Sequence, residues 1–403
     1  MVLLDWAKAF DKINREALFI AMHKMNIPTK MISVIRAMYT NTKFNITMEG
    51  HTSDWHIQET GIRQGCPLSP YLFLIIMTTL FHDIHMHDPQ NLTAHRICGA
   101  NFDEIVYADD TICVSTDTKA MNQFLKDIEE EGEKYGLKLN KGRCELLTTS
   151  LNADIKFKDG IKVPRKPEVT YLGCQINQYS NISQEISKRI MICMTILKKL
   201  LVDIFWRLCD VKIAFKITVL DAVIRSKLLY GIDSAQLTPS NQRRIEVFQL
   251  KGLRKILKMT TTYVERNNSN AEVFRKANEA IKQETPENKI PATAKPFVTC
   301  YLNSRMKRLA RIHNMPKEHP VRHITIGPNP DNNCVPWNPP NRRVGRPRFK
   351  WVTEAVGDIW ANIRHEHPSI PQAFDRKVEN KRQHEAVKDV MKNASSPAPF
   401  LSR

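Results

Sequence analysis

Several features that define large classes of protein are missing from this sequence. No run of about 18 apolar residues occurs, so no transmembrane helix is predicted. The opening residues MVLLDWAKAFDK are not a signal peptide, because Asp5 interrupts a very short apolar run that no basic region precedes. The nine cysteines have no framework spacing, and their odd number is typical of reduced thiols. We therefore expect an intracellular protein, nuclear or cytoplasmic or both, that is neither secreted nor bound to a membrane.

The composition is otherwise that of a soluble globular protein, except for the placement of charge. The chain has 403 residues, 42% apolar and 25% charged, which is enough for two or three domains. Residues 1–240 contain 29 Lys and Arg against 27 Asp and Glu, whereas residues 241–403 contain 31 against 15, a net charge of +16. This excess predicts a polyanion such as nucleic acid as the partner of the second part, although a generally basic, soluble surface would have the same composition.

Hydrophobic periodicity predicts an α+β protein in four segments. Residues 1–180 mix short strands with amphipathic helices, and residues 181–259 repeat apolar side chains at helical spacing. Residues 260–348 are polar, weakly periodic and then rich in Pro, Asn and Arg, which predicts a linker and an irregular segment. Residues 349–403 begin with an amphipathic pattern, so a short helical region is expected there.

Three carboxylates lie where apolar strands are predicted to end. Asp5 follows the strand Val2–Leu4, and Asp109 and Asp110 lie between two apolar strands in EIVYADDTICV. Adjacent aspartates repel each other, and a divalent cation commonly relieves that repulsion. Asp-Asp is also a favoured turn sequence, so from spacing alone a hairpin turn and a metal site remain equal alternatives.

Five sequence blocks resemble the motifs of one enzyme family, in the family's order. LLDWAKAFDKI at 3–13 resembles motif A, GIRQGCPLSP at 61–70 motif B, and YADD at 107–110 motif C. GLKLNKGRCELL at 136–147 resembles motif D, and VTYLGCQI at 169–176 resembles motif E. Residues 1–180 thus resemble the reverse transcriptase of a LINE-type (non-LTR) retrotransposon. The resemblance implies a right-hand polymerase palm, followed by an all-helical thumb and a basic, partly disordered tail.

The activity implied by this resemblance is RNA-directed DNA synthesis by two-metal nucleotidyl transfer. Asp5 and Asp109 would be the main metal ligands, with Asp110 beside them, for two Mg²⁺ ions or Mn²⁺ in their place. The implied partners are an RNA template, a DNA primer or target, and deoxynucleoside triphosphates. No oligomeric state is implied.

The resemblance also assigns binding roles to other residues. Phe10 matches the steric gate that rejects a 2′-hydroxyl, although a core aromatic is an alternative role. The residues expected beside the template and nucleotide are Arg63, Gln64 and Gly65, and those of the primer grip are Tyr171, Leu172 and Gly173. The last thumb helix would present basic side chains to phosphates, or simply to solvent: Arg243, Arg244, Lys251, Arg254, Lys255 and Lys258.

The sequence departs from the family pattern in two places. Motif A begins at residue 3, so the fingers that precede it in the family are missing from this sequence, and we expect impaired polymerase activity. Arg143 stands where motif D usually has lysine, and arginine is a poor proton donor. The alternatives to an enzyme are a catalytically inactive relic that binds nucleic acid, and an RNA-binding protein similar to intron maturases.

Overall fold

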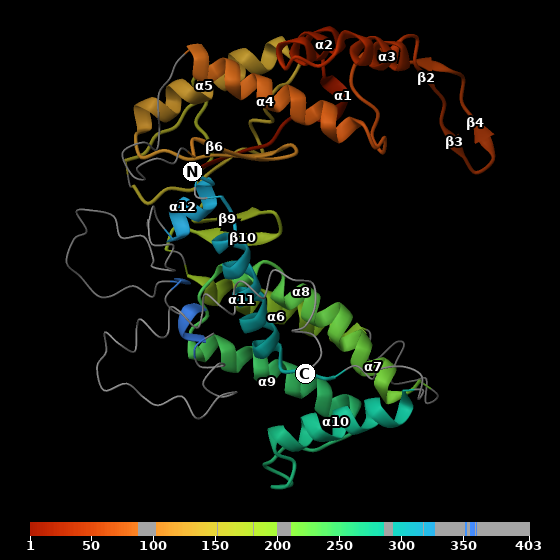
Figure 1. Cartoon of the computed structure of the whole chain (residues 1–403), viewed down its shortest axis with the longest axis vertical. Helices are drawn as coiled ribbons and strands as arrows, with labels where there is room; N and C mark the ends of the chain where they lie inside the picture. Colours follow the sequence, from red (N-terminus) through yellow and green to blue (C-terminus); the bar gives the residue numbers. More distant parts are fainter. Residues whose placement is uncertain are drawn as a thin grey trace. The chain divides into compact units, whose positions relative to one another are not determined.

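The protein divides into two compact units, unit 1 (Met1–Ser180) and unit 2 (Asn181–Arg403) (Figure 1). The division coincides with the predicted end of the first domain. The structure is a computed structural model, and it describes residues 1–87, 102–150, 152–179, 181–199, 211–285, 293–316, 318–326, 351–352, 355–358 and 360. Helices and antiparallel sheets both occur, so the predicted α+β class is confirmed. Within the described ranges, no helix is long and apolar enough to span a membrane.

A four-stranded antiparallel sheet organises unit 1. Its order is β6 (Glu104–Tyr107), β7 (Asp110–Cys113), β1 (Val2–Leu4) and β8 (Glu145–Leu146). The central strand β1 pairs with β7 through Leu4 opposite Thr111 and with β8 through Val2 opposite Leu146. The predicted first strand, β1, therefore lies between β7 and β8, two strands that are distant from it in sequence.

Helices bury one face of this sheet. Unit 1 contains α1 (Ala9–Lys12), α2 (Arg15–Lys24), α3 (Thr29–Tyr39), α4 (Ser69–His87) and α5 (Thr118–Lys134). Asn14 begins α2 as its cap, because its side chain accepts hydrogen bonds from the amides of Glu16 and Ala17. α4 packs against α2 and α5, and its apolar side chains join those of the sheet in one core (Figure 1). The apolar stretch of α4 is therefore part of the buried core of unit 1.

Small hairpins complete unit 1. The segment that follows α3 folds as β2 (Lys43–Phe44) paired with β5 (His56–Ile57) and β3 (Thr47–Met48) paired with β4 (His51–Thr52). Its apolar side chains Phe44, Met48 and Ile57 are exposed, so the hairpin is predicted correctly but covers no core. The last hairpin of the unit is β9 (Glu168–Tyr171) with β10 (Cys174–Asn177).

Unit 2 is helical throughout its described residues. Its elements are α6 (Ile182–Lys199), α7 (Ile213–Val219), the π-helix η2 (Leu220–Arg225), α8 (Ser226–Leu229), the 3-10 turn η3 (Ile232–Ser234), α9 (Pro239–Ile256), α10 (Asn270–Glu284), α11 (Phe297–His313) and α12 (Pro320–Ile326). α9 packs against α6, α7, α10 and α11 and so lies at the centre of the unit.

The predicted linker at 260–348 is wrong where α10, α11 and α12 form. α10 buries Val273, Ala277 and Ile281, which recur every four residues and face α7 and α9. Phe297 and Tyr301 of α11 join the same core. The helical unit therefore extends beyond the predicted end of the thumb at residue 259.

Some predictions lie outside the described residues. The basic cluster Arg342 to Lys350 and nearly all of the predicted helical region 349–403 are among them. Of that region, residues 351–352, 355–358 and 360 are described, and Val352, Ala355 and Val356 pack on Leu309 and Ala310 of α11.

Candidate active site

The register of the sheet brings Asp5 beside Asp110. Leu4 lies opposite Thr111, so the next residue of each strand, Asp5 and Asp110, continues the same antiparallel pairing beyond the end of β1. Val2 and Leu4 face the core, and side chains alternate along a strand, so Asp5 faces away from the helices. Asp110 follows the same alternation. Its neighbour Thr111 is buried on the core side, so Asp110 lies on the opposite side. Both carboxylates thus lie on the face of the sheet opposite the helical core.

Asp109 lies in the turn that joins β6 to β7. Tyr107 pairs with Asp110, so the turn consists of Ala108 and Asp109, one residue earlier than the predicted Asp109-Asp110 turn. Ala108 has a φ of 53°, in the left-handed region that tight hairpin turns require. The hairpin turn and the carboxylate site, which the sequence presented as alternatives, are therefore parts of the same feature.

The three carboxylates act on one another electrostatically. The pKa of Asp110 is raised above its ordinary value, first by burial and then by the negative charges of Asp109 and Asp5. Within the part of the chain that is described, however, no group of three His, Cys, Asp or Glu side chains forms a ready metal cage. Mg²⁺ commonly binds one or two carboxylates together with substrate phosphates and water. A set of neighbouring, mutually repelling carboxylates suits such an ion.

The motif A and motif B segments are joined through their backbones. The Gly61 amide donates to the carbonyl of Ile13 at 2.9 Å, and the Ile62 amide donates to that of Phe10 at 2.8 Å. Gly61 has a φ of +79°, and a Cβ there would lie 2.6 Å from the carbonyl oxygens of Phe10 and Asp11. Only glycine allows this approach, which fixes the start of the 61–70 loop against α1.

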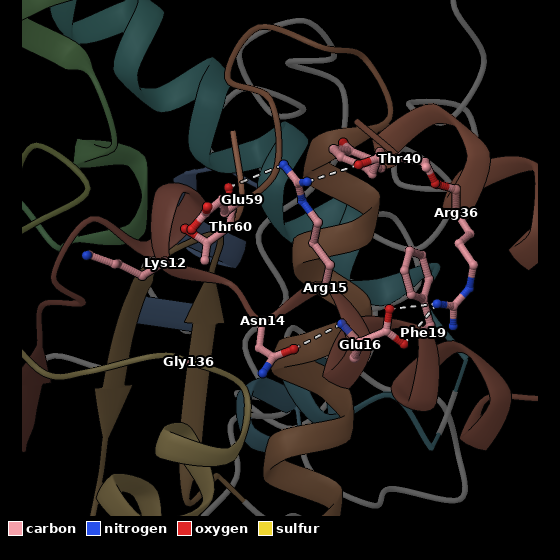
Figure 2. Close-up of a pocket in the computed structure, with 11 residues that line it drawn as sticks. Lys12, Asn14, Arg15, Glu16, Phe19, Arg36, Thr40, Glu59, Thr60 and Gly136 are labelled. Carbon is pink, nitrogen blue, oxygen red and sulfur yellow. Dashed lines mark hydrogen bonds and ion pairs between the residues drawn. The ribbon is translucent and has the colours of Figure 1, made fainter. Parts of the chain in front are cut away.

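Arg15 adds a side-chain connection to the same loop. Its Nε donates to the carbonyl of Gly61 at 2.9 Å, its Nη1 to that of Tyr39 at 3.0 Å, and its Nη2 to that of Thr60 at 3.4 Å. Figure 2 shows Arg15 in an open pocket of about 650 Å³, beside Arg36, which pairs with Glu16. This role could not be predicted from the sequence, because the three carbonyls lie in segments distant from Arg15.

The residues predicted to contact the template and nucleotide come directly after Gly61 and Ile62 in the 61–70 loop. Arg63, Gln64 and Gly65 are exposed, and Gln64 Nε2 donates to Asp11 Oδ1 at 3.2 Å. Arg63 Nη2 donates to the carbonyl of Met38 at 3.2 Å. Arg63 and Gln64 line a second open pocket, of about 660 Å³, with Asp11 and the β2–β5 hairpin. No atom lies within 4 Å of a Cβ built on Gly65, so that glycine faces open space.

Phe10 is held by another aromatic ring. It stacks on Phe73 of α4, with ring centroids 4.9 Å apart and an interplanar angle of 14°. It is half-buried and packs against the core of unit 1. Its predicted alternative as a core aromatic therefore describes a real contact, and its role as a steric gate stays a prediction.

The motif D segment lies next to Asp5. The Asn140 amide donates to the carbonyl of Asp5 at 2.7 Å, and the Ala7 amide donates to that of Lys138 at 2.8 Å. The side chain of Arg143 is exposed. The backbone around Asp5 is thus fixed on the side opposite β7.

The primer-grip residues form the turn between β9 and β10. Leu172 and Gly173 have φ values of 47° and 73°, so both lie in the left-handed region. The pKa of Tyr171 is raised, first by burial and then by the charge of Asp110. Tyr171 and Asp110 are therefore close enough to interact, and the motif E hairpin lies near the carboxylates.

The six basic residues predicted on α9 behave in two ways. Arg244 donates to Ser187 Oγ at 2.7 Å and Arg254 donates to Asn270 Oδ1 at 2.9 Å, so these two serve contacts within unit 2. The other four are exposed: Arg243, Lys251 and Lys255 on the side of α9 opposite its buried residues, and Lys258 just beyond the end of the helix. We call these four residues the α9 basic face.

Comparison with known proteins identifies relatives of the first unit. Residues 1–176 match the family model described as "Reverse transcriptase (RNA-dependent DNA polymerase)". A Pol polyprotein from the type-1 retrotransposable element R2 of Nasonia vitripennis is 28% identical over 203 residues, covering 46% of this chain and 19% of the relative. The RNA-directed DNA polymerase from mobile element jockey of Drosophila funebris is 23% identical over 263 residues, covering 63% of this chain and 28% of the relative.

These relatives are much longer than the matched segment. The chain spans 15–29% of the length of the first three curated relatives. Among solved structures, telomerase from Candida albicans in complex with a fragment of telomeric RNA aligns with a TM-score of 0.37 and 11% identity, covering 70% of this chain and 49% of that one.

Proposed function

Residues 1–176 of this chain form a reverse transcriptase domain, and on that premise we propose that the chain is an RNA-directed DNA polymerase of a non-LTR retrotransposon. Its substrates would be an RNA template, a DNA primer or nicked target, and deoxynucleoside triphosphates. The reaction joins the primer 3′-oxygen to the α-phosphorus of the nucleotide, and pyrophosphate leaves.

One observation carries this proposal: the β1–β7 register places Asp5 beside Asp110, with Asp109 in the adjoining turn. The pKa of Asp110 is raised first by burial and then by the negative charges of Asp109 and Asp5 beside it. The family implies a divalent metal cofactor, and we assign its binding here to Asp5 and Asp109, with Asp110 beside them. When bound, two Mg²⁺ ions supply the positive charge that activates the attacking hydroxyl and stabilises the leaving pyrophosphate.

The other residues would bind and orient the substrates. Arg63 and Gln64 line an open pocket beside α1, where they would contact the template and the incoming nucleotide. Phe10, held by Phe73, would limit space at the 2′ position of the sugar. Tyr171, Leu172 and Gly173, on the turn near Asp110, would hold the primer end close to the carboxylates.

Unit 2 would bind the nucleic-acid backbone through the α9 basic face. Its four side chains are exposed, three on one side of α9 and Lys258 just beyond its end, which suits a row of phosphates. A catalytically inactive nucleic-acid-binding relic would use the same face. The two functions therefore differ in unit 1 and can be separated there.

Primer extension tests the enzymatic function. The full chain is supplied with an RNA template, an annealed DNA primer, Mg²⁺ and deoxynucleoside triphosphates, and addition of nucleotides is followed on a gel. We expect weak extension, in line with the impaired activity expected from the sequence, that is lost in Asp109→Asn and kept in Asp54→Asn, an exposed aspartate in the hairpin after α3. Extension that persists in Asp109→Asn would contradict the proposal.

Metal mapping tests the site without relying on turnover. Fe²⁺ substituted for Mg²⁺ generates hydroxyl radicals that cut the backbone near the bound ion. Cleavage is expected close to Asp5 and to Asp109 in the same sample, and should be absent in Asp109→Asn. An inactive chain whose cleavage is elsewhere, or is unchanged in Asp109→Asn, would favour the relic.

A further inference from the structure

The loop between α9 and α10, residues 257–269, presents an aromatic side chain to solvent on a fixed frame. Tyr263 is 98% exposed, the highest value among the large apolar side chains of the described residues, and its neighbour Val264 is 72% exposed. Exposure alone does not make a binding site, but hydrogen bonds within the rest of this loop hold Tyr263 in a defined place.

Asn268 forms the frame of the α9–α10 loop. Its side chain is buried, and its Nδ2 donates to the carbonyl of Thr260 at 3.1 Å and to Thr260 Oγ1 at 2.9 Å. The two ends of the loop are thereby joined. The amides of Val264 and Glu265 both donate to the carbonyl of Thr261 at 3.0 Å, which closes a tight turn under Tyr263.

The same loop is attached to the last turn of α9. Arg254 Nη2 donates to the carbonyl of Asn268 at 3.2 Å, and the Met259 amide donates to the carbonyl of Arg254 at 2.9 Å. Lys258, the last residue of the α9 basic face, lies in this loop. Tyr263 therefore belongs to a loop that is fixed to the end of α9 and that contains an exposed cation.

Charge around Tyr263 is basic. Lys258 and Arg266 flank it and are exposed. Glu265, the single acidic residue of the loop, turns back to the frame, where its Oε2 accepts a hydrogen bond from Asn268 Nδ2 at 3.2 Å. An aromatic ring beside unpaired cations suits a base whose neighbouring phosphate is bound at the same time, whereas an apolar protein partner would have to desolvate those cations.

We propose that Tyr263 is a stacking platform for an unpaired base of single-stranded nucleic acid, whose backbone follows the α9 basic face. The phenol ring would contact the face of the base, and Lys258 and Arg266 would contact the adjacent phosphates. Stacking needs an unstacked base, so the site would bind single strands and not duplexes. The proposal requires nucleic-acid binding but not polymerase activity, so it can fail or hold independently of the proposed enzyme.

The test is a binding titration of the full chain with a mixed-sequence 20-nucleotide RNA, single-stranded and as a duplex, at several salt concentrations. Tyr263→Ala is expected to weaken single-strand binding about 5- to 150-fold, the range that base–aromatic stacking gives. Tyr263→Phe and Tyr263→Trp should bind as the wild type does, because each keeps an aromatic face. Duplex binding should change less than about twofold, since paired bases offer no free face.

Two further comparisons separate stacking from other roles. The slope of log affinity against log salt should be unchanged in Tyr263→Ala, because stacking releases no counterion, but shallower in Lys258→Gln. The matched control is Tyr179→Ala, a tyrosine 82% exposed in unit 1 with no basic neighbour in sequence. Equal loss on single strand and duplex, loss in Tyr263→Phe, or no loss in Tyr263→Ala would each overturn the proposal. A concentration-dependent dimer abolished by Tyr263→Ala, with RNA binding intact, would instead assign the loop to a second copy of the chain.

Discussion

Unit 1 and unit 2 differ in how they collect charged side chains. In unit 1, strand pairing brings Asp5, Asp109 and Asp110 together at one point, from segments distant in sequence. In unit 2, successive turns of α9 set cations in a row, and each cation acts separately. A site built by register depends on every member, whereas a row along a helix loses strength by steps. Single substitutions should therefore have large effects in unit 1 and graded effects along α9.

The largest effect is expected for Asp5→Asn. Nucleotidyl transfer should fall by about 10³-fold or more, because stabilisation by a bound metal is worth several kcal/mol. Affinity for the template–primer should not fall, since removing a negative charge cannot weaken phosphate binding. Steady-state primer extension and filter binding measure the two quantities, with Asp54→Asn as control. Parallel losses of activity and affinity would mean that Asp5 serves the fold and not the reaction.

A large loss of stability, confined to unit 2, is expected for Arg189→Met. Arg189 and Glu185 are both buried and paired, and Arg189 also donates to the carbonyl of Tyr230. Removing one partner should cost about 3–5 kcal/mol, because the other charge stays buried. Denaturant unfolding followed by hydrogen exchange measures the loss for each unit. The control is Arg225→Met, whose ion pair with Asp221 is exposed and worth about 0–1 kcal/mol.

Faster exchange of unit 1 amides in Arg189→Met would contradict the independence of the two units. Recovery of stability in the double variant Glu185→Leu, Arg189→Met is the expected companion result, because it removes both charges together.

Arg15→Met should loosen the 61–70 loop without unfolding unit 1. Three backbone carbonyls lose a charged donor, a loss worth about 1–3 kcal/mol. The Gly61 and Ile62 amides, which close the loop on α1, should exchange about 5- to 150-fold faster. Arg36→Met is the control, because its pair with Glu16 is exposed (Figure 2). Equal acceleration in both variants would show that Arg15 is one more surface arginine.

Graded losses are expected along the α9 basic face. Lys251→Gln and Lys255→Gln should each reduce the slope of log affinity against log salt by about 0.7–0.9, and the double variant by the sum. Arg275→Gln, on α10, should change nothing, because Arg275 is already paired with Glu272 and Glu279. Loss of all binding in one single variant would mean that α9, like the sheet, forms a site of mutually dependent residues.

The smallest effect concerns two partly exposed thiols. Hydrogen bonding, chiefly from the Leu68 amide, lowers the pKa of Cys66, whereas burial raises the pKa of Cys300. A lowered pKa leaves more thiolate at a given pH, so iodoacetamide near pH 8 should alkylate Cys66 several-fold faster than Cys300. Mass spectrometry of timed digests measures both rates. Faster labelling of Cys300 would contradict the electrostatics described for the 61–70 loop.

The sequence predicted most of what local rules determine. The strand before Asp5 and the hairpin around Asp109 both follow from hydrophobic alternation and turn chemistry. The five motifs identified the segments that meet at the sheet. Their meeting could be inferred only from the family resemblance, because the pairing of β1 with β7 depends on tertiary contacts.

Features that depend on tertiary contacts alone were missed. The sequence predicts a linker at α10 because one of the three residues on its buried stripe is Ala277, which carries little hydrophobic signal until α7 and α9 are packed against it. Arg15 was missed because its acceptors at Tyr39 and Gly61 lie 24 and 46 residues away. The exposure of Tyr263 could not be read from a polar stretch without knowing that Asn268 fixes it.

The central place of β1 in the sheet has a consequence for synthesis of the chain on the ribosome. Val2 pairs with Cys113 on one side and with Leu146 on the other. β1 therefore cannot pair until β7 and β8 have been synthesised and have left the ribosome. Until then its apolar residues are unpaired on a growing chain, and contacts of such long sequence separation form slowly. Translation halted before β8 would yield a protein that holds Asp5, Asp109 and Asp110 but lacks the strand that completes their sheet. Chaperones that bind short apolar segments would therefore bind the unpaired β1 strand before the carboxylate site is complete.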